Sequence, residues 1–183
     1  MTKSLITSIL CGVTLASLAY AQDGEVRTKQ YDDGGVYEGT FKNGLQHGTG
    51  TYTLPNGYEY VGEWVDGEIK GNGVARFPNG SVYEGEFEKG KPNGVGKIVF
   101  TDGGTYEGTW SEGKITGEGV AVYANGTRYE GGFRNAMHHG RGRMESPGGY
   151  VYEGDWVNGV KEGQASITYP DGAVYEGAVQ RGA

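Results

Sequence analysis

Six glutamates recur in this 183-residue sequence at positions that differ by 23 residues or by a multiple of 23. They are Glu38, Glu84, Glu107, Glu130, Glu153 and Glu176. Carboxylates are ligands of calcium, but one ion needs several oxygen atoms within about 2.6 Å. If each 23-residue unit adds two strands to a sheet, equivalent residues lie roughly 10 Å apart. The row is therefore interpreted as a solvated face, and neither a metal site nor a cofactor is predicted.

Two adjacent histidines, His138 and His139, are the other candidates for metal binding, and His47 stands four units before His139. Neither cysteine nor carboxylate accompanies them at a spacing typical of metal sites, which favours a plain surface turn. The one cysteine, Cys11, lies in a segment that we expect to be removed, and a Gly-x-Ser-x-Gly elbow is absent. No catalytic residue is therefore predicted, and the protein is not expected to be an enzyme.

Aromatic residues recur with the same period and could either form a core or stack against sugar rings. Each unit contains Tyr-Glu-Gly-x-Phe/Trp, and strand alternation places the Tyr, the Gly and the second aromatic on one face. These repeat-defining residues are Tyr37, Gly39, Phe41, Tyr60, Gly62, Trp64, Tyr83, Gly85, Phe87, Tyr106, Gly108, Trp110, Tyr129, Gly131, Phe133, Tyr152, Gly154 and Trp156. A ribbon one sheet thick has little else to bury, which favours a core. The alternative is carbohydrate or peptidoglycan binding through exposed Trp64, Trp110 and Trp156.

The strands and turns that position these residues are predicted from the glycines and turn dipeptides within one unit. A fixed period between 20 and 50 residues is typical of repeat arrays. Each unit begins with a strand, as at 106–110, which leads into a turn, as at Asn43-Gly44 in the first unit. A pair of glycines comes next, and then a short second strand, as at 97–100. The unit then closes on Asn-Gly or Asp-Gly, which are strong hairpin signals. The predicted fold is all-β, an elongated single-layer antiparallel ribbon of stacked β-hairpins.

The repeated pattern resembles the MORN repeat (membrane occupation and recognition nexus), through Tyr-Glu-Gly-x-Phe/Trp, a following x-x-Gly and then Gly-x-Gly. The resemblance, to an exported bacterial type, implies scaffolding, protein binding and, in some members, attachment to membranes or anionic lipids. Four positions depart from the pattern, namely Val61, Ala136, Ala165 and Val179. The fifth to seventh units, which hold three of the four, are expected to be somewhat less regular.

Three segments are predicted along the chain. Residues 1–21 have a basic Lys3, an apolar run and a final Ala19-Tyr20-Ala21, the pattern of a secretory signal peptide. Cleavage near Ala21 predicts export to the periplasm or the cell surface. Residues 22–36 form a polar lead-in with a partial repeat, and residues 37–183 form the array, with six full units and a truncated seventh. The open C-terminal edge of that last unit is a candidate homodimer contact.

The charge of the sequence narrows the choice of partners. With 16 basic and 23 acidic residues the net charge is −7, which argues against nucleic acid as a partner. The candidate partner-contacting residues are Lys70, Lys89, Lys91, Lys114, His138, His139 and Lys161. The predicted function is non-catalytic binding or scaffolding at the bacterial cell envelope, by protein–protein or membrane-surface association. A protein or envelope component is the expected partner, and a membrane lipid is a candidate.

Overall fold

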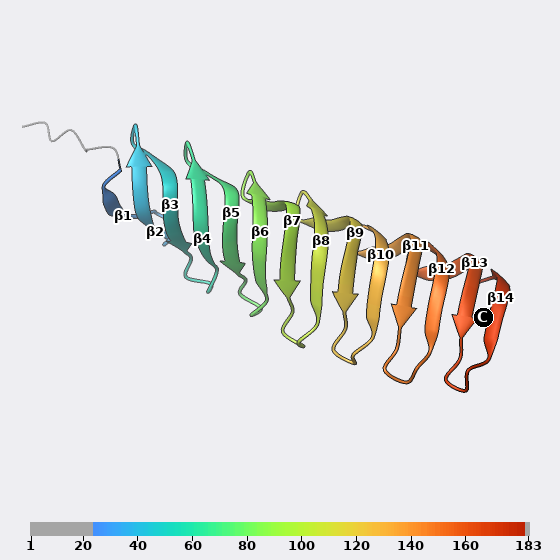
Figure 1. Cartoon of the computed structure of the whole chain (residues 1–183). Coiled ribbons are helices and arrows are strands. Elements are labelled where there is room, and N and C mark those ends of the chain that lie inside the picture. Colours follow the sequence, from blue (N-terminus) through green and yellow to red (C-terminus); the bar gives the residue numbers. More distant parts are fainter. Residues whose placement is uncertain (1–23, 182–183) are drawn as a thin grey trace, which may run out of the picture.

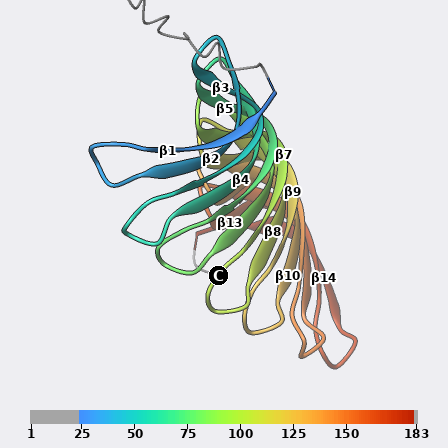
Figure 2. The same cartoon turned by 90° about the vertical axis from the view of Figure 1, so that its left-hand side faces the viewer.

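The computed structural model describes residues 24–181, which form a single open sheet of 14 antiparallel strands (Figure 1). The strands are β1 (Val26–Gln30), β2 (Val36–Lys42), β3 (Leu45–Thr53), β4 (Glu59–Val65), β5 (Glu68–Arg76), β6 (Val82–Glu88), β7 (Lys91–Val99), β8 (Thr105–Ser111), β9 (Lys114–Val122), β10 (Arg128–Arg134), β11 (Met137–Glu145), β12 (Val151–Val157), β13 (Val160–Thr168) and β14 (Val174–Val179). Each strand pairs with its neighbours in sequence, so every connection is a hairpin. Successive hairpins rotate progressively, and the ribbon is twisted along its length (Figure 2). The predicted all-β ribbon is confirmed, and the predicted signal peptide lies outside the described residues.

The second strand of each unit is longer than predicted. We expected a short run over 97–100, but β7 begins at Lys91 and includes the glycine pair. The prediction was wrong because it assigned Gly94 to a connection. Gly94 has a φ of +91°, yet the strand continues through it, because the glycine lies within a bulge of β7 that faces Glu86 of β6.

Two kinds of turn alternate along the ribbon. Within a unit, two residues in the left-handed region join the strands, as at Asn43 and Gly44 with φ of 51° and 80°, values that suit a type I′ hairpin. Between units, a longer loop contains an Asn or Asp whose side chain replaces a backbone acceptor, except in the loop at Gly148. Asn56 Oδ1, for example, accepts the amide proton of Tyr58 at 3.0 Å. Both turns were predicted from their Asn-Gly or Asp-Gly dipeptides.

A β-bulge at the same place in every full unit bends the sheet. In the third unit the pairing shifts between Gly85 and Phe87, where Glu86 of β6 alone lies opposite residues 93–95 of β7, so the bulge is in β7. The Tyr83 hydroxyl donates to the Glu86 carbonyl at 3.0 Å, and the Glu86 carboxylate accepts the amide proton of Val95 at 3.0 Å. The same hydroxyl-to-carbonyl bond is donated by Tyr37, Tyr60, Tyr83, Tyr106, Tyr129, Tyr152 and Tyr175. Each bulge is therefore closed by a buried phenol that keeps its hydrogen bond.

A row of small residues, the glycine row, crosses the whole sheet beneath the tyrosine rings. It comprises Gly39, Gly50, Gly62, Gly73, Gly85, Gly96, Gly108, Gly119, Gly131, Gly142, Gly154, Ala165 and Gly177. A Cβ at Gly96 would collide with the ring of Tyr83, so glycine here lets the ring lie directly on the backbone. The tyrosines of the six full units are consequently 0–1% exposed.

The core is one aromatic row on this face of the sheet. Tyr83 packs edge-to-face against Phe87 of its own unit and Trp110 of the next, with ring centroids 5.1 and 5.0 Å apart. Because each second aromatic also contacts the tyrosine of the preceding unit, the row couples neighbouring units. Trp64, Trp110 and Trp156 are buried, which confirms the predicted core. The exposed indoles on which the carbohydrate alternative depended are not present.

The two outer strands of the sheet differ. In β1, Arg27 pairs with Gly39, and its guanidinium lies 4.6 Å from the ring centroid of Phe41. A charged residue on an edge strand discourages further strand pairing. Within residues 24–181 no strand pairs with the outer side of β14, where Tyr175 is 42% exposed. Self-association through β14 stays a prediction.

Candidate binding surfaces

Two cavities open on the aromatic face at equivalent places two units apart. One, of about 410 Å³, is lined by Tyr52, Tyr58, Trp64, Glu68, Ile69, Lys89 and Gly90. The other, of about 270 Å³, is lined by Phe100, Asp102, Gly104, Thr105, Tyr106, Ile115, Ala121, Val122, Tyr123, Phe133 and Ala136. A shift of two units superposes Ile69 on Ile115 and Gly90 on Ala136, so the cavities repeat one feature of the fold. We call the surface that these residues line the aromatic groove.

Half-exposed rings border the aromatic groove. Phe100 and Tyr123 are 39% and 41% exposed and stand immediately before the loops between units. Phe100 and Tyr123 also line the second cavity. Exposed aromatic rings beside a concave apolar surface are typical of a place where a protein segment binds.

His138 packs into the aromatic row in the fifth unit, whereas the sequence predicts a surface turn there. It lies in β11, and its ring stacks on Tyr129 with centroids 3.7 Å apart. Its edge contacts are Phe133 and Trp156, and the Tyr123 hydroxyl lies 2.6 Å from His138 Nε2. The expectation was wrong because β11 begins at once after a two-residue turn. The signal that could have found this placement is the 23-residue alignment, since His138 occupies the position of two buried isoleucines.

We expect the packing of His138 to make the stability of the fold depend on pH. Burial lowers the pKa of His138 to about 4, below the value of about 6.5 in an unfolded chain. The unfolded chain therefore binds a proton first, and stability that is complete above pH 6.5 declines as the pH falls toward 4. We expect a loss of about 1–2 kcal/mol over this window, since solvent around the partly exposed ring screens the cost.

Urea unfolding at pH 7 and at pH 4.5 measures this dependence. His138→Ile, which copies the residue of the second and fourth units, should remove the loss attributable to the histidine. His139→Gln, a control at the neighbouring position, should retain it. If His138→Ile loses as much stability between pH 7 and pH 4.5 as the unmodified protein, the loss does not come from His138.

Lys161 takes the position of His138 in the sixth unit and lies among aromatic rings. Its Nζ is 4.5, 4.8 and 5.7 Å from the ring centroids of Tyr150, Tyr152 and Trp156. It also donates a hydrogen bond to the Tyr150 hydroxyl at 3.0 Å. Cation–π contacts of this kind hold the ammonium group against the aromatic face.

The structure does not gather the remaining candidate residues into one site. Lys70 pairs with Glu88 at 3.1 Å, and Lys91 pairs with Glu112 at 3.0 Å. Both ion pairs join the tips of successive hairpins and are exposed, so each contributes little to stability. His139 Nδ1 accepts the Asn158 amide proton at 3.4 Å, Lys114 is the exposed first residue of β9, and Lys89 lines the first cavity of the aromatic groove.

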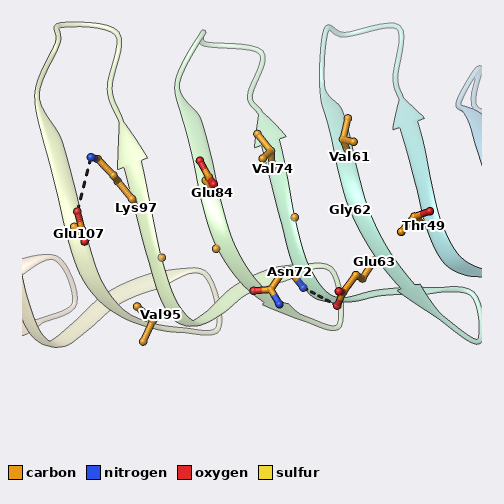
Figure 3. Close-up of a pocket in the computed structure, with 13 residues that line it drawn as sticks. Thr49, Val61, Gly62, Glu63, Asn72, Val74, Glu84, Val95, Lys97 and Glu107 are labelled. Atoms are coloured by element: carbon orange, nitrogen blue, oxygen red, sulfur yellow. Dashed lines mark hydrogen bonds and ion pairs between the residues drawn. The ribbon is translucent and has the colours of Figure 1, made fainter.

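The opposite face of the sheet has a wider depression of about 800 Å³ (Figure 3). Its lining combines Val61, Val74 and Val95 with polar residues and with glycines of the glycine row. In Figure 3, Val61 and Val74 lie in the upper part of the depression, and Val95 lies near its lower end. From the sequence, this face is predicted to carry only solvated carboxylates. Val61, which replaces a glutamate of the repeat, was the signal for its apolar part.

A sequence model of the MORN repeat matches residues 37–57, 60–82, 83–105, 106–128, 129–149 and 152–174. The chain belongs to the MORN repeat family. Part of the MORN array is 46% identical to alsin from Rattus norvegicus over 50 residues, and 42% identical to alsin from Homo sapiens over 50 residues. Each match covers 25% of this chain and 3% of alsin, so it concerns the repeats and not the activity of the larger protein.

Among solved structures, the MORN array is similar to the SAS-4 (dCPAP) TCP domain of Drosophila melanogaster, solved in complex with a proline-rich motif of Ana2. The TM-score is 0.47 and the identity 9%, over 93% of this chain and 97% of that one. The TCP10 domain of Danio rerio CPAP, solved in complex with a STIL peptide, gives a TM-score of 0.41 and 18% identity, over 85% and 82% of the two chains. At these scores neither structure informs the ligand of this chain.

In residues 24–181 no group of three or more His, Cys, Asp or Glu side chains could hold a metal ion. The same part of the chain contains no helix with the length and apolar character needed to cross a membrane.

Proposed function

We propose that the MORN array is a non-catalytic binding and scaffolding protein, and that its aromatic groove holds an extended segment of a partner protein. The observation that carries this proposal is the pair of equivalent cavities two units apart. Four strands separate them, a distance of about 19 Å, which an extended chain covers in about six residues. One segment with two apolar side chains six residues apart can therefore fill both cavities and cover the rings of Phe100 and Tyr123.

We place this function at the bacterial cell envelope, as an exported MORN-repeat protein in the periplasm or on the cell surface. The support is the signal-peptide pattern of residues 1–21, with its basic start, apolar run and Ala-x-Ala end. The sole cysteine also lies in that segment, and an array held together by repeat stacking needs no disulfide in an oxidising compartment.

Two other classes of partner have less support. A glycan platform needs exposed indoles, and the three tryptophans are buried. Binding to anionic lipid needs free cationic groups, whereas Lys70 and Lys91 are paired with glutamates and Lys161 is held among aromatic rings. A protein segment matches the apolar groove better than either.

A photo-crosslinking residue at Phe100 or at Tyr123 tests the groove in cells. We expect both positions to give an adduct with the same protein. The matched control is Ser111, which is exposed near a hairpin tip on the opposite face. Adducts formed equally well from Ser111, or none from the groove, would contradict the proposal.

Fractionation of the tagged full-length protein tests the compartment separately. We expect the tagged protein in the periplasmic or envelope fraction, shortened by a cleavage near Ala21. Full-length protein confined to the cytoplasm would refute export without affecting the proposal for the groove.

A further inference from the structure

The face opposite the aromatic groove is strongly acidic. Strand register places two rows of side chains on this face, one on each side of the glycine row. One row contains the six recurring glutamates. The other contains Glu63, Glu86, Glu118 and Asp155. Within these two rows the ten carboxylates stand against three cations, Lys97, Arg141 and Arg143. Arg76 and Arg128 lie on the same face in the next row, together with Glu59 and Glu145.

Most of these carboxylates are not neutralised within the array. Glu107 lies 3.8 Å from Lys97, and Glu130 lies 2.7 Å from Arg128. In residues 24–181 the other eight carboxylates of the two rows form no ion pair. The face therefore presents uncompensated negative charge to solvent and favours a cationic partner.

The same face offers apolar surface where the charges are sparse. Val61 is 47% exposed and Val95 is 62% exposed, and both line the 800 Å³ depression (Figure 3). Glu84 and Glu107 line the same depression. A ligand that binds there can cover the valine side chains and contact the carboxylates at the same time. A free cation in solution can contact only the carboxylates.

The spacing of the carboxylates selects a conformation for such a ligand. Equivalent glutamates lie two strands apart, about 9.6 Å. A polyproline II helix repeats one face every three residues, about 9.3 Å. Two turns of an α-helix advance about 10.8 Å, and an extended strand presents the same face about every 6.8 Å. Over four units the polyproline II repeat drifts by about 1 Å and the α-helical one by almost 5 Å.

We propose that this acidic face binds a segment of a partner protein in the polyproline II conformation, with a lysine or arginine at every third position. The cations face Glu84, Glu107 and Glu130 in turn, where they displace the exposed side chains of Lys97 and Arg128 from the last two. The residues between them cover the valines. Other ligand classes fit poorly, because anionic lipid is repelled and carboxylates about 10 Å apart cannot share a metal ion.

Two synthetic peptides with equal composition separate spacing from net charge. One consists of six Pro-Pro-Lys repeats, and its isomer carries the same six lysines in two blocks. We expect the regular peptide to bind the full-length protein several-fold more tightly at low ionic strength, as measured by isothermal titration calorimetry. We also expect its affinity to fall with added salt.

Variants of the protein locate the site. The triple variant Glu84→Gln, Glu107→Gln, Glu130→Gln should weaken binding on the order of tenfold, since each exposed ion pair contributes a few-fold. The control changes the same charge at the hairpin tips, with Glu68→Gln, Glu88→Gln and Glu112→Gln, and should alter the affinity less than twofold. Circular dichroism melting curves confirm that both variants are folded.

Two outcomes would overturn the proposal. They are equal binding of the two peptides and an unchanged affinity in the triple variant. Failure here leaves the aromatic groove untouched, because Phe100 and Tyr123 lie on the other side of the sheet.

Discussion

Gly108→Ala is expected to destabilise the MORN array by about 3 kcal/mol or more, at the upper end of what overpacking costs. An added Cβ would lie 2.5 Å from the Tyr106 hydroxyl oxygen and 2.6 Å from both the Glu118 carbonyl oxygen and Gly119 Cα. Two of these three obstacles are backbone atoms of the neighbouring strand. These backbone atoms of β9 cannot move away without breaking the backbone hydrogen bonds between β8 and β9. Urea unfolding followed by circular dichroism measures the loss.

Two other glycines calibrate this result. Gly148 has no heavy atom within 4 Å of an added Cβ, so Gly148→Ala should change the stability by less than about 0.5 kcal/mol. Gly96→Ala should have an intermediate effect, because the obstacle is the movable ring of Tyr83. The sixth unit already carries Ala165 in this row while Tyr152 stays fully buried. Coincident unfolding curves for Gly108→Ala and Gly148→Ala would show that the close approach does not matter.

The sequence predicted those parts of the fold that depend on local pattern. Alternation put Tyr83, Gly85 and Phe87 on one face because a strand has a period of two whatever it packs against. The Asn-Gly and Asp-Gly dipeptides marked the turns because few residues tolerate a positive φ. The strand through Gly94 was missed because the bulge of β7 is defined by how β7 pairs with β6, and the sequence of β7 alone does not record that pairing.

The roles of individual polar residues were harder to predict. Glu84 and Glu86 are two residues apart on one strand face and look equivalent in the sequence. Both are exposed, but the Glu86 carboxylate also accepts the Val95 amide proton. Only the bulge distinguishes them. His138 was similarly misplaced, because its adjacent histidine suggested a metal pair or a loop, while the periodic alignment places it at a core position.

The second large effect is expected at Trp110, in the middle of the array. Trp110→Ala should cost about 3–5 kcal/mol, the usual range for deleting a buried large aromatic side chain. The indole contacts Tyr83 of the preceding unit and Tyr106 of its own, with centroids 5.0 and 5.6 Å apart. Because each unit contacts only its neighbours, its loss should also uncouple the two halves of the array. Hydrogen exchange should then show the segments before and after β8 opening independently.

Replacement of the tryptophans by phenylalanine separates ring packing from the indole hydrogen bond. Phe87 and Phe133 occupy the equivalent position in other units, so the smaller ring itself should be tolerated. Trp110 Nε1 donates to the Gly96 carbonyl at 3.1 Å, whereas within the described chain the buried Trp64 Nε1 has no partner. Trp110→Phe should therefore cost about 1 kcal/mol more than Trp64→Phe. Equal costs would mean that the hydrogen bond contributes nothing and that the core is held by its ring contacts alone.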